Sequence, residues 1–534
     1  MEQQTDKQRC ARLIERKHKL IAERETWEEH WQDVADYVLP RKADIEKTRT
    51  KGDKRTELIF DATAIHALEL LSASLHGMLT NSASAWFALA YKDNFLDTDD
   101  ASKEWLESAQ ESMYVAFSRS NFQQEIHEFY YDLASFGTAC MFVESDEENV
   151  MRFSTRYVKE FCISENSRGI VDTVYRELKM SARQCIEKFG KDKVSQRVLR
   201  LMDKDPYEEI KIMHVVMPRS DRDYAKKDSI NKPFASIYCD VEDKIILSEG
   251  GYDEFPFMVS RWLKASNEVY GRSPAMTALP DIKMLNKMSE TSIRAVQKQV
   301  DPPLLVPDDG FILPIRTVPS GLNFYRAGSR DRIEPLVTGA NTMLGLNYEE
   351  QRREAIRQAF YVDQLILTQN QNMTATEVVQ RNEEKMRLLA PVLGRLQSEL
   401  LQPLITRVFN IMLREGKVPE APPMLQGQPI EIEYVSPLAK AQRQSELQSV
   451  LRSLEIAMPL AETTNIMDHY DMDALIKHAA NVLGVPSKVL RSSQEVANMR
   501  QERQEQQQQQ AEMQEAQQMS EVAKNAAPMI KAVE

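Results

Sequence analysis

Signals for membrane insertion, secretion and cysteine chemistry are missing from this sequence. No stretch approaches the ~20 consecutive apolar residues that a membrane-spanning helix needs. The N-terminus is densely charged and contains no apolar segment of the kind that a secretory signal requires. The cysteines form no C-x-x-C pair, which argues against zinc-knuckle and redox motifs; they are Cys10, Cys140, Cys162, Cys185 and Cys239. We therefore expect a soluble protein, cytoplasmic at synthesis and with no membrane partner, whose cysteines are reduced and partly buried.

Motifs for catalysis are also missing. The Phe-Gly-Lys at 189–191 lacks the upstream glycine and the Ser or Thr of a nucleotide-binding P-loop. His127-Glu128 is followed by Tyr131 where a zinc protease would place its second histidine, and no G-x-S-x-G elbow occurs. We therefore expect no enzyme activity, no catalytic or metal-binding residues and no cofactor.

The charge balance is acidic, with 68 basic and 81 acidic residues and a net charge of −13 over 534 residues. Tight non-specific DNA binding depends on clustered Lys and Arg that face the phosphates. The composition therefore argues against a static DNA binder. It does not argue against a channel, because an acidic or mixed lining lets DNA slide.

The order of apolar patterns predicts an α+β protein that is mainly helical. Apolar residues recur at helical spacing in residues 7–38, 61–79 and 105–136. Asp61 is the expected N-cap of the second of these helices. Between 138 and 261 the pattern changes to short strands, expected at 139–144, 151–158, 170–178, 210–217, 235–239 and 244–247. One helix, at 181–189, is expected to interrupt them.

Residues 281–300 predict a helix with two contrasting faces. At ~100° per residue its apolar side chains fall on one side, and its bases fall within about 60° on the other. The bases are Lys283, Lys287, Arg294 and Lys298. Such a stripe is typical of a solvated helix face, of a helix that lines a wet channel, or of one that faces a groove between neighbouring copies.

The following segment predicts a projecting insertion. Pro302 and Pro303 end the helix, and residues 301–345 carry short apolar runs between prolines and glycines. A second helix at 346–360 bears Arg352, Arg353 and Arg357. A helix out, a compact β tip and a helix back account for this order.

Polar amides then interrupt the helical pattern at 368–373, before a long helix that ends at Gly416. Thr374 to Glu377 fits a capping box, and Pro391 and Pro403 should kink the helix. A strand is expected at 430–435, followed by helices at 437–534 that contain a glutamine tract at 506–510.

Several segments, in the same order along some 400 residues, resemble the portal proteins, or head-to-tail connectors, of T7-like short-tailed bacteriophages. They are LIFDATAIHALELLSASLHGMLT at 58–80, Ser-Asn-Phe and Phe-Gly-Thr-Ala-Cys within 120–140, Met-Pro-Arg at 217–219, NEVYGRSPAMTALPDIKMLNKM at 267–288, TATEVVQRNEE at 374–384, LQSELLQPL at 396–404 and YVSPLAKAQR at 434–443. Each segment alone is weak, and their order makes the match specific.

The resemblance implies a portal fold of wing, stem, clip and crown or barrel, assembled as a dodecameric ring. By this comparison the regions are 1–265 for the wing (helices at 1–137, β-rich part at 138–265), 266–300 and 346–362 for the stem helices, 301–345 for the clip, 363–373 for the tunnel loop, 374–436 for the wing helix and return strand, and 437–534 for the crown and barrel.

Candidate site residues follow from this assignment. The tunnel loop would present Gln369, Asn370, Gln371 and Asn372 to DNA. The basic stripe of the stem combines the four bases of the first helix with Arg352, Arg353 and Arg357. The clip would dock partners through Pro302, Pro303, Asp308, Asp309, Phe311, Arg316, Arg330 and Arg332.

The implied function is a channel at one capsid vertex for packaging and ejecting double-stranded DNA. The implied partners are the terminase large subunit, a tail adaptor, scaffolding and major capsid proteins and eleven further copies of the chain. The implied location is the virion, and the host cytoplasm during assembly. The alternatives are a helical adaptor or scaffold protein without a channel, and a terminase subunit, against which the missing P-loop argues.

Overall fold

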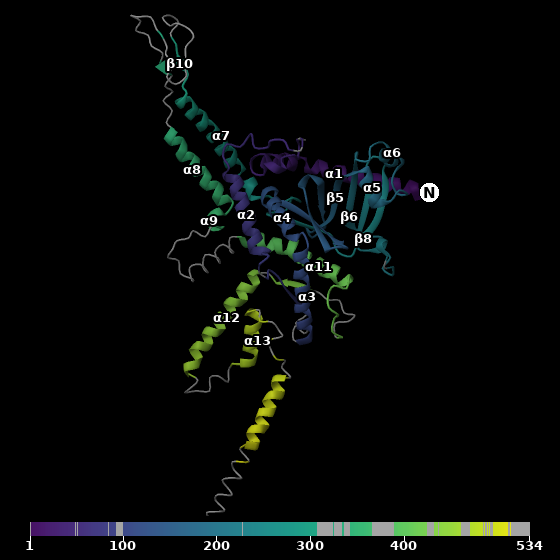
Figure 1. Cartoon of the computed structure of the whole chain (residues 1–534), viewed down its shortest axis with the longest axis vertical. Coiled ribbons are helices and arrows are strands. Elements are labelled where there is room, and N and C mark those ends of the chain that lie inside the picture. Colours follow the sequence, from purple (N-terminus) through teal and green to yellow (C-terminus); the bar gives the residue numbers. More distant parts are fainter. Residues whose placement is uncertain are drawn as a thin grey trace, which may run out of the picture. The chain divides into compact units, whose positions relative to one another are not determined.

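The computed structural model contains helices and antiparallel sheets in two compact units (Figure 1). The described residues are 2–47, 50, 52–83, 85–91, 100–226, 228–306, 324, 334–335, 342–365, 389–423, 432–435, 437–460, 470–483, 485, 489, 491, 495–510 and 513. The first unit comprises residues 1–86 and 116–411, and the second comprises 87–115 and 412–534.

Three helices and two sheets form the body of the first unit. The helices are α1 (Glu2–Tyr37), α2 (Thr63–Leu79) and α4 (Phe122–Phe136). α4 buries nine residues against β2, β3 and α2, and its C-terminus is closed by Gly137 in the left-handed conformation. Trp31 of α1 is fully buried and donates its indole N–H to the Phe136 carbonyl at 3.0 Å.

The larger sheet has five antiparallel strands in the order β4-β5-β6-β7-β8. They are β4 (Phe161–Glu165), β5 (Val171–Ser181), β6 (Glu209–Pro218), β7 (Phe234–Asp240) and β8 (Ile245–Tyr252). The smaller sheet has the order β3-β2-β9, from β2 (Thr138–Asp146), β3 (Val150–Arg156) and β9 (Phe257–Arg261). Two short helices, α5 (Ala182–Phe189) and α6 (Gln196–Lys204), connect β5 to β6.

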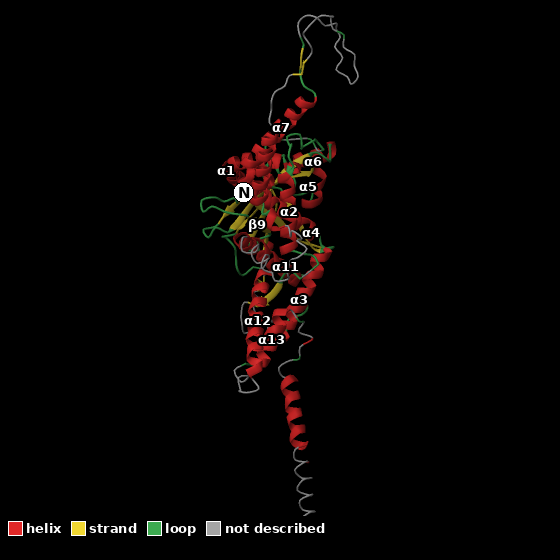
Figure 2. Cartoon of the chain, turned by 90° about the vertical axis from the view of Figure 1, so that its left-hand side faces the viewer, coloured by secondary structure: helices red, strands yellow, loops and turns green. Residues whose placement is uncertain are grey.

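A pair of helices leads away from these sheets to a short β-ribbon. α7 (Pro274–Val300) and α8 (Thr342–Ala359) contact each other, and β10 (Leu304–Leu305) pairs with β11 (Glu334–Pro335) beyond them (Figures 1 and 2). The short α9 (Val362–Leu365) follows α8. The chain is helical again from 389, passes through a π-helical turn at Gln397–Leu401 and continues as α11 (Gln402–Arg414).

The second unit holds a two-stranded sheet and mainly helical segments. β1 (Ala88–Tyr91) pairs with β12 (Ile432–Val435), and α3 (Asp100–Arg119) begins in this unit. Trp105 donates its indole N–H to the Pro419 carbonyl at 2.9 Å. α12 (Pro437–Ala457) contacts α13 (Met472–Leu483), and residues 495–510, which include the glutamine tract, are helical and mostly exposed.

The mixed helix-and-sheet class predicted from the sequence is confirmed, and each of the six expected strands in 138–261 has a counterpart. Within 138–261 the sequence missed the strands β4 and β9 and the second helix, α6, and before that range it missed the strand β1. The prediction of Asp61 as N-cap was wrong, because α2 begins after Ala62, which makes no side-chain cap. The Asp61 carboxylate instead accepts a hydrogen bond from the Thr63 N–H at 2.9 Å and forms an ion pair with Arg353.

The cysteines are all buried as free thiols, which agrees with the expectation. Within the described ranges, no helix combines the length and the apolar character needed to cross a bilayer.

Candidate functional site

The start of α7 is fixed by backbone chemistry rather than by apolar burial alone. Ser273 is the N-cap: its hydroxyl accepts the Met276 N–H at 3.0 Å and donates to the Ser135 carbonyl at 2.6 Å. Pro274 occupies the first helical position, where a missing N–H costs nothing. These bonds set the direction in which α7 leaves the body of the unit.

A close approach of two glycines supports this start. A Cβ on Gly271 would lie 2.3 Å from the Gly137 carbonyl oxygen, and a Cβ on Gly137 would lie 2.3 Å from that of Gly271. Gly137 also has φ +75°, which L side chains rarely adopt. The segment that precedes α7 can therefore pack on the end of α4 only if both positions lack a side chain.

α7 and α8 are joined along one face by polar contacts. Arg352 forms an ion pair with Asp281 at 2.8 Å, and the Ser292 hydroxyl bonds the Glu349 carboxylate at 2.6 Å. Gly345 of α8 lies close to the same serine, because a Cβ on it would be in ordinary contact with the Ser292 hydroxyl at 3.6 Å. At ~100° per residue, Asp281 and Ser292 lie about 140° around α7 from the centre of the basic stripe. The bases of α7 therefore point away from α8.

Most of the seven predicted stem bases are ion-paired within the chain. Lys283 bonds Asp33 of α1 at 2.7 Å, and Arg353 bonds Asp61 at 3.0 Å, so these two tie the helix pair to the body of the unit. The remaining pairs are Lys287 and Arg294 with Glu290, Arg352 with Asp281, Arg353 with Glu349 and Glu350, and Arg357 with Glu350 and Glu354. Lys298 is exposed and makes no ion pair with another described residue.

These contacts neutralise most of the stripe. α7 carries four bases and two acids, a net charge of +2, and α8 carries three of each, a net charge of 0. Hydrogen bonds from Lys287 lower the pKa of Glu290, and those from Arg357 and Arg353 lower the pKa of Glu350. Both acids therefore stay ionised near neutral pH and keep the surface close to balanced.

The apolar face of α7 divides into a buried and an exposed part. Ile282 and Leu285 are 5% and 1% exposed, whereas Ile293, Val296 and Val300 are 44%, 47% and 81% exposed. The sequence predicted one continuous apolar face. In the single chain the apolar face of α7 is covered as far as Leu285, and its side chains from Ile293 onward are exposed.

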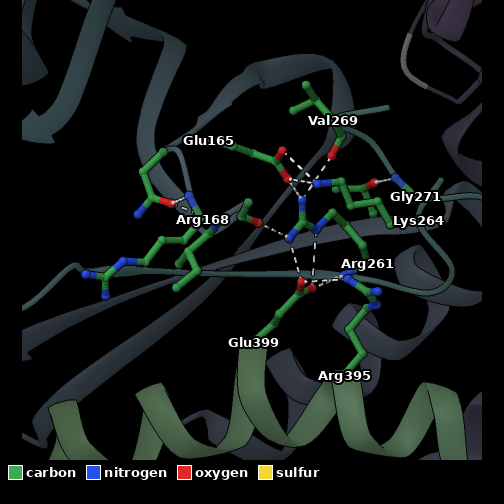
Figure 3. A network of polar contacts seen from close by, with 12 residues as sticks. Glu165, Arg168, Arg261, Lys264, Val269, Gly271, Arg395 and Glu399 are labelled. Atoms are coloured by element: carbon green, nitrogen blue, oxygen red, sulfur yellow. Dashed lines mark hydrogen bonds and ion pairs between the residues drawn. The ribbon is translucent and has the colours of Figure 1, made fainter. Parts of the chain in front are cut away.

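A buried ionic network, which we call the Arg261 clamp, forms around Arg261 of β9 (Figure 3). Arg261 is 1% exposed at the end of β9. Its backbone N–H and its Nη2 donate to Glu399 at 2.9 and 2.5 Å, its Nη1 bonds Glu165, and Nη2 reaches the Gly169 carbonyl at 3.1 Å. Lys264 adds a second cation to Glu165 at 2.6 Å. The clamp thus joins β9, the end of β4 and the π-helical turn.

The π-helical turn places Glu399 in this network. Gln402 donates its N–H to the Gln397 carbonyl, one residue further back than in an α-helix, immediately before Pro403. Proline has no N–H, so the helix cannot continue its regular ladder there. The sequence predicted a disturbance at Pro403, and neither Arg261 nor Glu399 was singled out, because nothing local marks a long-range ion pair.

Several predicted site residues lie outside the described part of the chain. They are Gln369, Asn370, Gln371 and Asn372 of the tunnel loop, and Asp308, Asp309, Phe311, Arg316, Arg330 and Arg332 of the clip. Pro302 and Pro303 are described, and they separate Asp301, the C-cap of α7, from β10.

Comparison with known proteins identifies the family. The profile of the bacteriophage head to tail connecting protein family matches residues 11–490. A probable portal protein of Bordetella phage BPP-1 is 33% identical over 506 residues, which cover 92% of this chain and 90% of that protein. The portal protein of Salmonella phage epsilon15 is 33% identical over 503 residues, with the same coverage of both chains.

A more distant relative connects the chain to the group whose segments it resembles. The portal protein of Enterobacteria phage T3 is 21% identical over 505 residues, covering 91% of this chain and 89% of that protein. The resemblance read from the sequence and the expectation of a structural rather than enzymatic role are both confirmed. The chain belongs to the family of bacteriophage head-to-tail connecting proteins and is a portal-type component of the virion.

Proposed function

We propose that twelve copies of this chain form a ring at one capsid vertex and that double-stranded DNA passes through its centre. The observation that carries the proposal is the family match over residues 11–490, since that family connects phage heads to tails. In this proposal α7 and α8 are the stem helices, 301–345 is the clip, 363–373 is the tunnel loop and 437–534 forms the crown and barrel. A ring of this kind closes through heterologous contacts between neighbours.

The exposed apolar residues of the helix pair support assembly. Ile293, Val296 and Val300 on α7, and Leu346 on α8 with 55% exposure, leave apolar side chains in water in the single chain. Contiguous exposed apolar surface is typical of an interaction site. A neighbouring copy in the ring would cover these side chains.

The charge pattern supports passive guidance of DNA rather than binding. Twelve chains carry a net charge of about −156 (12 × −13), which disfavours tight capture of phosphates. The ion-paired bases of α7 soften this repulsion locally without offering a row of free cations. We further propose that Gln369, Asn370, Gln371 and Asn372 contact the DNA backbone through short-lived hydrogen bonds.

The partners follow from the same proposal. The clip would dock the terminase large subunit, which supplies ATP hydrolysis, and later a tail adaptor. Scaffolding and major capsid proteins would assemble around the ring in the host cytoplasm.

A packaging assay tests the proposal. Proheads built with this protein, terminase, ATP and DNA should protect a genome length of DNA from nuclease. Reversing Lys287, Arg294 and Lys298 to Glu changes α7 from +2 to −4 and should slow packaging, because repulsion along the channel rises.

The matched control reverses Lys179, Arg183 and Lys191 around α5. All three are exposed, as the three bases of α7 are. As in α7, two of them form ion pairs, Lys179 with Glu209 and Arg183 with Glu187, and the third, Lys191, forms none with another described residue. The control should package at the wild-type rate. Equal rates for the α7 variant and the wild type would contradict the placing of α7 along the channel, and absence of protected DNA with the wild type would contradict the channel itself.

A further inference from the structure

The interior of the first unit contains a row of aromatic and basic side chains where its two sheets meet. Arg176, His214 and Tyr238 stand side by side on β5, β6 and β7. The His214 ring stacks on Tyr238 at 4.0 Å and lies 6.0 Å from the ring of Phe142 on β2. The larger sheet therefore brings an arginine and a histidine to its contact with the smaller sheet.

Two further cations reach this row from neighbouring elements. Arg156, the last residue of β3, places its guanidinium 5.5 Å from the Phe142 ring. Lys188 of α5 places its ammonium 4.7 Å from the Tyr238 ring. We call Arg156, Arg176 and Lys188, together with His214, the cationic seam.

The two half-buried arginines of the seam have few acceptors. The side chain of Arg156 makes no hydrogen bond or ion pair with any other described residue, and that of Arg176 has one ion pair, from its Nε to Glu160 at 3.5 Å. The side chain of Lys188, which is exposed, makes no ion pair with another described residue either. The Nε atoms of Arg156 and Arg176 and the Nδ1 of His214 are buried without a hydrogen-bond partner. His214 itself is 0% exposed, so water outside the protein does not reach it.

Three buried arginines of the same unit, Arg24, Arg261 and Arg407, have several acceptors each. Arg24 bonds the carboxylate of Glu28 and three backbone carbonyls, and Arg407 bonds Glu254 and two backbone carbonyls. Arg261 has two carboxylates and two carbonyls. A buried donor without an acceptor is costly, so the seam differs from these sites in a way that calls for an acceptor.

The electrostatics favour a negatively charged acceptor. Three cations face two acids, Glu144 and Glu160, which leaves a charge of +1 when His214 is neutral. Burial and then the neighbouring Arg176 lower the pKa of Arg156, while burial, with Arg176 and Arg156 adding to it, lowers the pKa of Lys188. Burial also holds the pKa of His214 well below its usual range, so that ring stays neutral.

We propose that the cationic seam binds an oxyanion of the phosphate class. A guanidinium presents its N–H groups as a fork that matches two oxygens of a phosphate, and Lys188 would add a point charge. Lys188 is exposed on α5 while its ammonium lies against the Tyr238 ring, so its side chain connects the seam with the solvent. Free inorganic phosphate and a phosphodiester of nucleic acid share this chemistry, and the competition experiment below distinguishes them. This site lies within the sheets and does not depend on the proposed DNA channel.

Calorimetric titration of the full-length protein with inorganic phosphate, at an ionic strength held constant with chloride, tests the site. The wild type should bind phosphate saturably. Arg156→Gln should weaken binding roughly tenfold or more, because hydrogen bonds to a charged partner are lost. Lys188→Gln, at an exposed position where folding is not at risk, should also weaken binding.

Arg183→Gln is the matched control, since it removes one positive charge from the same helix, α5, at an exposed pair with Glu187. It should bind phosphate as the wild type does. No saturable binding by the wild type, or equal affinity in the wild type and in both seam variants, would overturn the proposal.

Competition with a short DNA duplex separates the two sources of the anion. Displacement of phosphate by the duplex in the wild type assigns the site to a phosphodiester. Phosphate binding that the duplex leaves unchanged assigns it to free phosphate. Either result supports an anion site, and circular dichroism of Arg156→Gln confirms that its lost binding is not lost folding.

Discussion

Replacing Glu399 by Ala should release the π-helical turn from the end of β9. The carboxylate accepts the Arg261 backbone N–H at 2.9 Å, Arg261 Nη2 at 2.5 Å and Arg395 Nη1 at 3.1 Å. Its removal leaves the guanidinium of Arg261, 1% exposed, with Glu165 as its remaining carboxylate. Removing one partner of a buried ion pair lowers the stability of the fold by about 3–5 kcal/mol. Because Glu165 still pairs with Arg261, we expect a loss of about 3 kcal/mol.

Hydrogen exchange read by mass spectrometry measures this loss locally. A loss of about 3 kcal/mol corresponds to exchange roughly a hundredfold faster in peptides that cover 257–261 and 397–401. Glu399→Gln keeps one carbonyl acceptor but loses the charge, so its exchange should be intermediate. Glu187→Gln, at an exposed ion pair, should leave exchange in both peptides unchanged. Exchange in Glu399→Ala within about threefold of the wild type would refute the conclusion that the clamp fastens the π-helical turn to the end of β9.

Three other predictions address stability and assembly. Burial raises the pKa of Asp132 to about 6, although Lys42 opposes the shift. A carboxyl group whose pKa is raised on folding stabilises the folded state at low pH, and this stabilisation is lost as the pH rises. In thermal unfolding, the stability of the wild type relative to Asp132→Asn should therefore fall by on the order of 3 kcal/mol between about pH 4 and pH 7. Gly271→Ala should lower the free energy of unfolding by about 1–3 kcal/mol, because the new Cβ would collide with the Gly137 carbonyl. Gly77→Ala, at an open position in a helix, should raise the free energy of unfolding by about 0.4–1 kcal/mol, and denaturant titration measures both effects. Ile293→Glu combined with Val296→Glu should shift the native mass from rings to single chains, because these exposed apolar positions would be charged, while Gln297→Glu on the same turn should keep the ring.

The sequence predicted those parts of the fold that depend on local patterns. The spacing of apolar residues and the position of turn residues located α7, α8 and six strands of the two sheets, because each of these elements has a regular apolar face or a run of β-branched residues. β9 was missed, since FMVSR is buried at every position and shows no alternation. Asp61 was misplaced because an Asp near a helix start can bond the first N–H groups from outside the cap position.

The candidate site was predictable only in part. Helical spacing gave the stripe of Lys283, Lys287, Arg294 and Lys298, but it could not show that Lys283 bonds Asp33, about 250 residues away in sequence. The Arg261 clamp joins residues separated by 96 and 138 positions, and no local pattern encodes such pairs. Which residues of the tunnel loop and the clip contact DNA and partner proteins stays a prediction.

Native mass spectrometry combined with negative-stain electron microscopy of the purified protein tests the central claim most directly. At 61.4 kDa per chain, twelve copies correspond to about 737 kDa (12 × 61.4), and heterologous closure should appear as rings with a central hole. Rings of this mass are the predicted result. A compact monomer or dimer at every salt concentration and in the presence of scaffolding protein would contradict the channel and favour an adaptor without one.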